Sequence, residues 1–160
     1  AFLAFAWFLL ALSLIDLDHH LLPDDLTLPL LWLGLLVSAF NLGLPGVSLF
    51  DAVIGAAAGY MTLWSLFWAF LLVTGKEGLG YGDFKLLAAL GAWLGWQAIL
   101  PVLLLASLAG AAIGLILIVF GGRERSAPLP FGPFLAAAGF VMLIWGPQAL
   151  ALYGTLFAPH

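Results

Sequence analysis

Long apolar stretches, separated by short polar or Gly/Pro-containing segments, dominate the pattern of this chain. The breaks leave six candidate helices, over residues 1–15, 27–44, 51–74, 84–97, 98–120 and 133–153. Several of these approach the ~20 residues that cross a bilayer core, and the chain lacks the alternation of membrane β-strands. The pattern therefore predicts an all-α, polytopic transmembrane helix bundle with about six membrane-inserted helices, folded as one domain over residues 1–160.

Glycines indicate where these helices pack and turn. Gly95-Trp96-Gln97, shortly before Pro101, predicts a tight connection, so that the short fourth helix and the fifth either form a hairpin or include a partly inserted helix. The small-residue runs 55–59 and 109–114 predict packing seams, because they let helix backbones approach closely in lipid.

The composition agrees with a membrane location. Hydrophobic residues make up 65% of the chain and charged residues only 8%, whereas about 25% of a soluble domain is charged. Cysteine is absent, which excludes disulfides and thiolate chemistry within these residues. No basic run exists to hold nucleic acid.

The first apolar run, Ala1 to Ile15, is not a typical signal peptide, because it has no basic n-region and no small-residue cleavage site. It is also short for a full span. We therefore expect this chain to be the membrane part of a longer protein with a further segment upstream.

Charge distribution predicts an orientation. With this helix order, all four basic residues lie on one side of the membrane: Lys76, Lys85, Arg123 and Arg125. That side is predicted to be cytoplasmic, since Lys and Arg are enriched there. The same side holds every acidic residue except Asp51: Asp16, Asp18, Asp24, Asp25, Glu77, Asp83 and Glu124.

An acidic cluster joins the first two helices. Asp16 follows the apolar run directly, so a helix continuing past Ile15 would hold its carboxylate near the bundle interior, where ionisation is costly. For Asp24 and Asp25, which follow Pro23, we favour a role in capping the second helix. Asp18 is interpreted as a solvated loop residue rather than a second active carboxylate.

His19 and His20 raise the alternative of a metal site, because imidazole and carboxylate ligands stand within five residues. Consecutive residues rarely converge on one ion, so we favour contact with lipid head groups. No metal site is predicted.

A second polar segment, Gly78 to Lys85, contains Asp83 between glycines and an apolar helix. Its glycines permit positive φ and close chain approach, and Asp83 could simply cap the fourth helix. Nucleotide binding is poorly supported, since neither glycine-rich phosphate motif is complete. Two carboxylates brought together on one face of the bundle could share a proton and activate water against an amide, as in an aspartic protease.

These segments resemble the bacterial prepilin peptidases, membrane aspartic proteases of the Gly-x-Gly-Asp type. The resemblance rests on Asp16 with Leu22-Pro23-Asp24, on residues 22–32, and on residues 80–85 continuing to Ala92. The block Leu129-Pro130-Phe131-Gly132-Pro133-Phe134 is also similar, and the likeness covers nearly the whole chain.

The resemblance implies that Asp16 and Asp83 are the catalytic pair, with a supporting set around them: Gly80, Tyr81, Gly82, Lys85, Pro23 and Asp24. It implies cleavage of the basic leader of type IV prepilins or type II secretion pseudopilins, after a glycine, at the cytoplasmic face of the bacterial inner membrane. Proteolysis then needs no cofactor.

The chain departs from many family members, which carry two upstream Cys-x-x-Cys pairs that bind zinc and often methylate the new N-terminus with S-adenosylmethionine. Zinc and methylation are therefore implied only for a longer protein that includes such a segment.

The main rival is a small transporter or channel in which Asp16 and Asp83 bind cations or relay protons, since intramembrane carboxylates are common in such pathways. A purely structural membrane subunit is a third interpretation.

Overall fold

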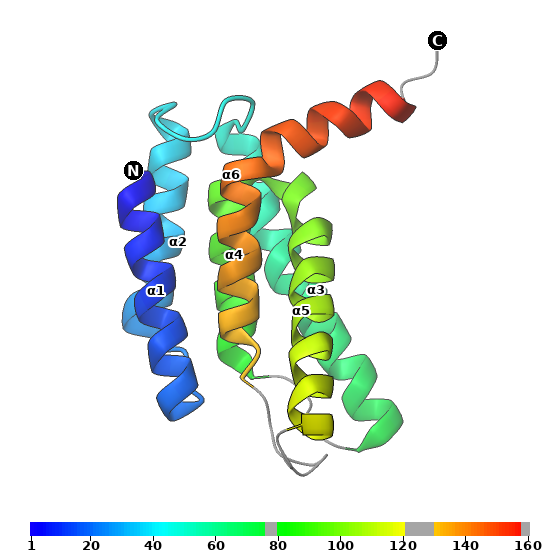
Figure 1. Cartoon of the computed structure of the whole chain (residues 1–160). Helices are drawn as coiled ribbons and strands as arrows, with labels where there is room; N and C mark the ends of the chain where they lie inside the picture. The colour runs from blue at the N-terminus through cyan, green and yellow to red at the C-terminus, as the bar shows by residue number, and fades with distance from the viewer. Residues whose placement is uncertain (76–79, 121–129, 158–160) are drawn as a thin grey trace.

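The computed structural model describes residues 1–75, 80–120 and 130–157. Within these ranges the chain forms six α-helices and one short 3-10 helix, and no strand. The helices are α1 (Phe2–His19), α2 (Asp24–Ala39), α3 (Leu49–Thr74), α4 (Tyr81–Leu94), η1 (Trp96–Ala98), α5 (Ile99–Phe120) and α6 (Gly132–Phe157). Successive helices run up and down through the bundle, as Figure 1 shows. The predicted all-α bundle is confirmed.

Helix α4 lies at the centre of the bundle and contacts α2, α3 and α6 (Figure 1). Every residue from Leu86 to Leu94 is buried, on all faces of the helix. Such a helix shows no amphipathic stripe, because neighbouring helices cover it all round. It is the shortest α-helix described, which fits a core element enclosed by its neighbours.

Small residues set the approach of α3 to α4. A Cβ on Gly59 would lie 2.5 Å from the Leu87 carbonyl oxygen, and Gly55 and Gly91 meet backbone to backbone. The predicted seam at residues 55–59 is therefore present. The second predicted seam, at residues 109–114, is largely wrong: residues 109 and 111–113 are exposed, although Gly110 lies near the Phe134 ring.

The outside of the bundle carries many exposed large apolar side chains, such as Leu3, Trp7, Trp32 and Val73. An apolar exterior suits lipid as the surrounding solvent. Among the described residues, three helical stretches are long and apolar enough to cross a membrane: Phe2–His19, Leu49–Thr74 and Trp96–Phe120. The apolar stretch Gly132–Gly146 is shorter. This is the composition of a multi-pass membrane protein.

Several predicted boundaries shift. Helix α1 continues past Ile15 to His19, α2 begins at Asp24 rather than residue 27, and α2 ends at Ala39 rather than 44. The early end of α2 coincides with a left-handed Asn41 (φ 54°), which breaks the helix before Pro45 and Gly46. The predicted tight connection after α4 is confirmed, with Gly95 at φ 81° leading into η1.

The two ends of the bundle differ in polarity. One end holds the end of α1 and the starts of α2, α4 and α6 (Figure 1). It carries Asp16, in the last turn of α1, and Asp83, in the first turn of α4. The other end carries Asp51, in the first turn of α3, as predicted. Lys76, Glu77, Arg123, Glu124 and Arg125, which entered the prediction of orientation, lie outside the described residues.

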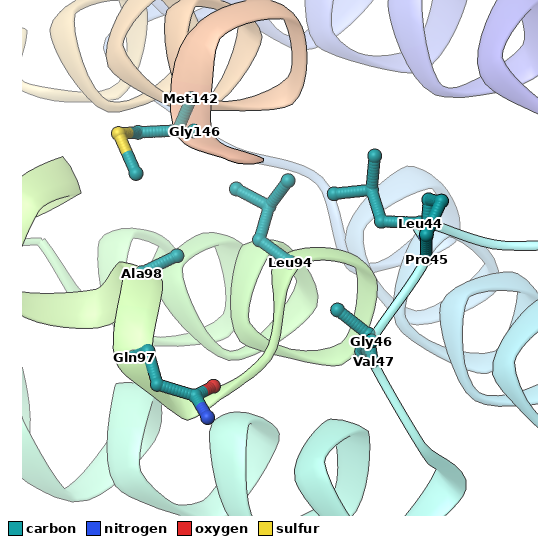
Figure 2. A pocket seen from close by; sticks show the side chains of 9 residues that line it. All are labelled: Leu44, Pro45, Gly46, Val47, Leu94, Gln97, Ala98, Met142 and Gly146. Atoms are coloured by element: carbon teal, nitrogen blue, oxygen red, sulfur yellow. The ribbon is translucent and has the colours of Figure 1, made fainter. Parts of the chain in front are cut away.

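A cavity of about 330 Å³ lies at the end opposite Asp16 and Asp83, beside Leu94, Ala98 and the loop Leu44–Val47 (Figure 2). Its walls are mostly apolar, with the Gln97 amide as the polar side chain. Since none of its lining residues is acidic, this cavity is not where carboxylate chemistry could occur.

Candidate functional site

Asp16 lies in the last turn of α1 and is only 5% exposed. The helix continues past Ile15, so the carboxyl group stays inside the bundle, as predicted. Its Oδ2 accepts a hydrogen bond from the Gly132 main-chain N–H at 3.0 Å. A buried carboxylate needs such donors, because it has left water behind.

Asp83 stands in the first turn of α4 and is 6% exposed. Its Oδ2 accepts a hydrogen bond from the Gly80 N–H at 3.3 Å, which satisfies a donor at the helix start. The alternative that Asp83 caps α4 is therefore correct. A residue that only caps a helix does not need a buried carboxyl group, however. Asp83 caps α4 and also faces the interior.

The structure brings Asp16 and Asp83 to the same end of the bundle, from helices that are distant in the sequence. The two carboxyl groups are close enough to interact electrostatically. Among the described residues, the buried polar or charged side chains are Asp16, Thr27, Ser38 and Asp83. These two are therefore the only buried acids in that part of the chain.

Asp24 and Lys85 form an ion pair beside this site, with Lys85 Nζ 2.5 Å and 2.7 Å from the two Asp24 carboxyl oxygens. The predicted capping of α2 by Asp24 and Asp25 is corrected here. Pro23 is the N-cap residue, and no side chain makes a capping hydrogen bond. Both acids lie in the first turn, where they still complement the helix dipole.

Tyr81 and Gly82 lie at the start of α4 and make different contacts. The Tyr81 ring packs against Phe67 and Phe84, at centroid distances of 5.3 and 5.6 Å, although the residue is 59% exposed. A Cβ on Gly82 would stand 2.6 Å from Leu22 Cβ. Gly82 therefore permits the loop between α1 and α2 to pass against α4.

The remaining polar residues of the first cluster face outward. Asp18 is exposed, as predicted, but it lies in the last turn of α1, so the prediction that it belongs to a loop is wrong. His20 ends α1 in a left-handed conformation (φ 51°), and it interacts electrostatically with Asp16. In the ranges that the structure describes, no three His, Asp or Glu side chains gather to hold a metal ion.

Sequence reasoning assigned no role at this site to Gly132 or Leu22, although both contact it. Gly132 touches Asp16, and Leu22 lies against both Gly132 and Gly82. The signals that could have found them were the glycine and proline of residues 129–134 and the leucine before Pro23.

Fold and site together define a helical membrane protein with two interacting buried carboxyl groups at one end of the bundle. Water activation and proton relay are the chemistries that such a pair can perform. Residues 3–115 match the type IV leader peptidase family, and the chain belongs to that family.

Curated relatives agree with this assignment. The chain is 62% identical over 157 residues to a prepilin leader peptidase/N-methyltransferase of Aeromonas hydrophila, covering 98% of this chain and 53% of that protein. Proteins with the same description from Pseudomonas aeruginosa and Dichelobacter nodosus are 57% and 50% identical over 153 residues. The alignment with the Pseudomonas protein covers 96% of this chain and 52% of that protein, and the alignment with the Dichelobacter protein covers 95% and 51%. The chain thus spans about half the length of these relatives. No solved structure matches it.

Proposed function

We propose that this chain is the peptidase domain, over residues 1–160, of a membrane aspartic endopeptidase that processes prepilins. The relatives are described as prepilin leader peptidases, which supports the substrate class. The finer proposal is removal of the basic leader of type IV prepilins or type II secretion pseudopilins, at the cytoplasmic face of the bacterial inner membrane.

One observation carries the mechanism: Asp16 and Asp83 are buried at the same end of the bundle and interact with each other. Two carboxylates in such proximity do not both ionise readily, so one proton is shared between them. The ionised member takes a proton from water as it attacks the scissile amide, while the protonated member donates to the substrate. No acyl-enzyme forms, and proteolysis by this pair requires no cofactor.

The surroundings of the pair suit a substrate with a basic leader and an apolar helix. Asp18 and Asp25 are exposed at the same end, where they would attract a positively charged leader. The apolar outside of the bundle allows the hydrophobic part of the substrate to remain in lipid. Methylation with S-adenosylmethionine, and a zinc-binding segment, are proposed only for the whole protein, as the names of the relatives include N-methyltransferase.

Asparagine variants test this function in the whole protein. Asp16→Asn and Asp83→Asn keep side-chain size but remove the acid, so each should abolish prepilin cleavage while the protein still folds. Asp18→Asn, exposed two residues beyond Asp16 on the same helix, is the matched control: it should leave kcat unchanged and at most raise KM through a weaker attraction of the leader. Asp51→Asn, at the other end, is a second control.

Near-normal cleavage by either Asp16→Asn or Asp83→Asn would show that the assigned residue is not catalytic. A transporter or channel would instead show no prepilin cleavage in the unchanged protein and would lose ion flux in both variants.

A further inference from the structure

The start of α6 contributes a main-chain donor to the carboxylate site. Gly132 N–H reaches Asp16 Oδ2 at 3.0 Å across 116 positions of sequence, and this hydrogen bond is buried. The match to the family ends at residue 115, so Gly132 lies outside it. Gly132 belongs to the block Leu129–Phe134 that resembles the family, yet the resemblance assigned this residue no role at the site.

Only glycine fits at this position without a shift of the neighbouring atoms. A Cβ on residue 132 would stand 2.5 Å from Asp16 Oδ2, 3.1 Å from Asp16 Cγ and 3.2 Å from Leu22 Cδ1. The constraint is steric rather than conformational. It comes from how closely the backbone of α6 approaches the carboxyl group itself.

Leu22 links this contact to the second carboxylate. Its Cδ1 lies against Gly132, and its Cβ and carbonyl oxygen lie against Gly82, the residue that precedes Asp83 in the sequence. One leucine thus packs between two glycine backbones, each of which adjoins one acid. The spacing between the end of α1 and the start of α4 depends on this contact.

The two acids are held in the same way, each by one main-chain N–H that donates to its Oδ2 atom. Asp16 Oδ2 is held by Gly132 N–H, and Asp83 Oδ2 is held by Gly80 N–H. Main-chain donors cannot rotate away as side chains can, so they fix the carboxyl planes. No described residue donates a hydrogen bond to either Oδ1 atom, and the proposed mechanism assigns these two atoms to the shared proton and the attacking water.

We infer that Gly132 is a positioning residue of the peptidase site: its main-chain N–H fixes Asp16, and Leu22 sets the distance from Asp16 to the helix that carries Asp83. This inference rests on the proposed function. It adds Gly132, at the start of α6, and Leu22, in the α1–α2 loop, to the site residues that the resemblance implies.

Gly132→Ala, made in the whole protein, is the direct test. The added methyl must displace Asp16 or the α6 backbone, and a misplacement of about 1 Å can cost about 100-fold in rate. We expect kcat for prepilin cleavage to fall at least about tenfold with KM within about twofold. Gly139→Ala is the matched control, since its methyl would meet the flexible end of Leu90 at the same 2.5 Å, away from both acids.

The pH profile separates positioning from loss of folded protein. A hydrogen bond to an ionised carboxylate favours ionisation, so weakening the Gly132 donor should move the acidic limb of the rate profile to higher pH. Asp83 on α4 and His20 after α1 are the titratable groups that interact with Asp16 among the described residues, and the variant changes neither. A smaller folded fraction would instead lower the rate equally at every pH.

Leu22 provides a second variant without a clash, in case Gly132→Ala does not fold. Leu22→Ala should lower kcat and displace the pH profile in the same direction, while Leu22→Met should restore both, because it refills the space. The inference is overturned if Gly132→Ala has the same kcat and pH profile as the unsubstituted protein. If Gly132→Ala does not fold, the same result for Leu22→Ala overturns it. If the Asn variants at 16 and 83 also cleave normally, the proposed function itself has failed.

Discussion

Lys85, at the start of the second turn of α4, and Asp24, in the first turn of α2, form an ion pair in which Nζ approaches both carboxyl oxygens. Lys85 stands two residues after Asp83, and Asp24 stands two residues after Leu22. The pair therefore spans the segments that position the two buried acids. It is partly exposed, at 31% for Lys85 and 55% for Asp24, so its contribution to folding stability is small.

Exchange of the two charges tests whether this ion pair positions the site. Lys85→Asp alone places two acids together, and we expect prepilin cleavage to fall by about three- to tenfold, in line with modest coupling of exposed pairs. The double variant Asp24→Lys with Lys85→Asp should recover most of that loss. The measurement is kcat/KM for prepilin cleavage at low and high salt, since screening weakens an exposed pair.

Asp25→Lys with Lys85→Asp is the control for the exchange. Asp25 is also exposed in the first turn of α2 but makes no ion pair with Lys85. Equal recovery in both double variants would mean that net charge, rather than the Asp24 pairing, matters.

A shared proton between Asp16 and Asp83 predicts a bell-shaped dependence of kcat on pH. Activity needs one carboxyl group ionised and the other protonated, so it should fall when both are protonated and again when both are ionised. The two apparent pKa values of the profile belong to the pair rather than to either residue. Cleavage of prepilin by the whole protein across pH 4 to about 10 provides the measurement. A rate that stays constant over this range would contradict a carboxylate pair.

The polar site was predictable in part because its two acids break apolar runs. An acid directly after a long apolar stretch, as at Asp16, and one within glycines, as at Asp83, are unusual enough in sequence to be noticed. The helix order then places both at one end, and the structure agrees. The ion pair of Lys85 with Asp24 was not predictable, because it depends on how two helix starts face each other across the bundle.

Gly132 and Leu22 show why the rest of the site could not be deduced. Each acts through contacts whose partners are remote or lie on another helix, and each residue type is common in membrane helices. The central position of α4 could not be predicted from the sequence either. A helix buried on every face and a helix exposed to lipid on one face are both apolar all round, so hydropathy does not distinguish them.

Trp93 ties α4 to α2 and offers a test of the core. Its Nε1 donates to the Leu30 carbonyl oxygen at 2.8 Å in a buried contact, and its ring packs against Phe5 at a centroid distance of 4.9 Å. Trp93→Phe loses the hydrogen bond and leaves unfilled volume, so we expect a loss of about 1 to 2 kcal/mol of folding free energy. Denaturant unfolding in detergent measures this loss. Trp32→Phe, on the exposed side of α2, should unfold like the unchanged protein.

Gly55 and Gly91 set the contact between α3 and α4, and Gly91→Ala should be among the most damaging small substitutions. A Cβ on Gly91 would overlap the Gly55 carbonyl group, which is main chain and cannot turn aside as a side chain does. The two helices must separate, and overpacking of this kind costs about 1–3 kcal/mol or more. Since α4 carries Asp83 at its far end, cleavage should fall together with thermal stability. Gly110→Ala is the control, because its methyl would meet Phe134 only at an ordinary 3.5 Å. An unchanged Tm for Gly91→Ala in detergent would show that α3 and α4 are not in backbone contact.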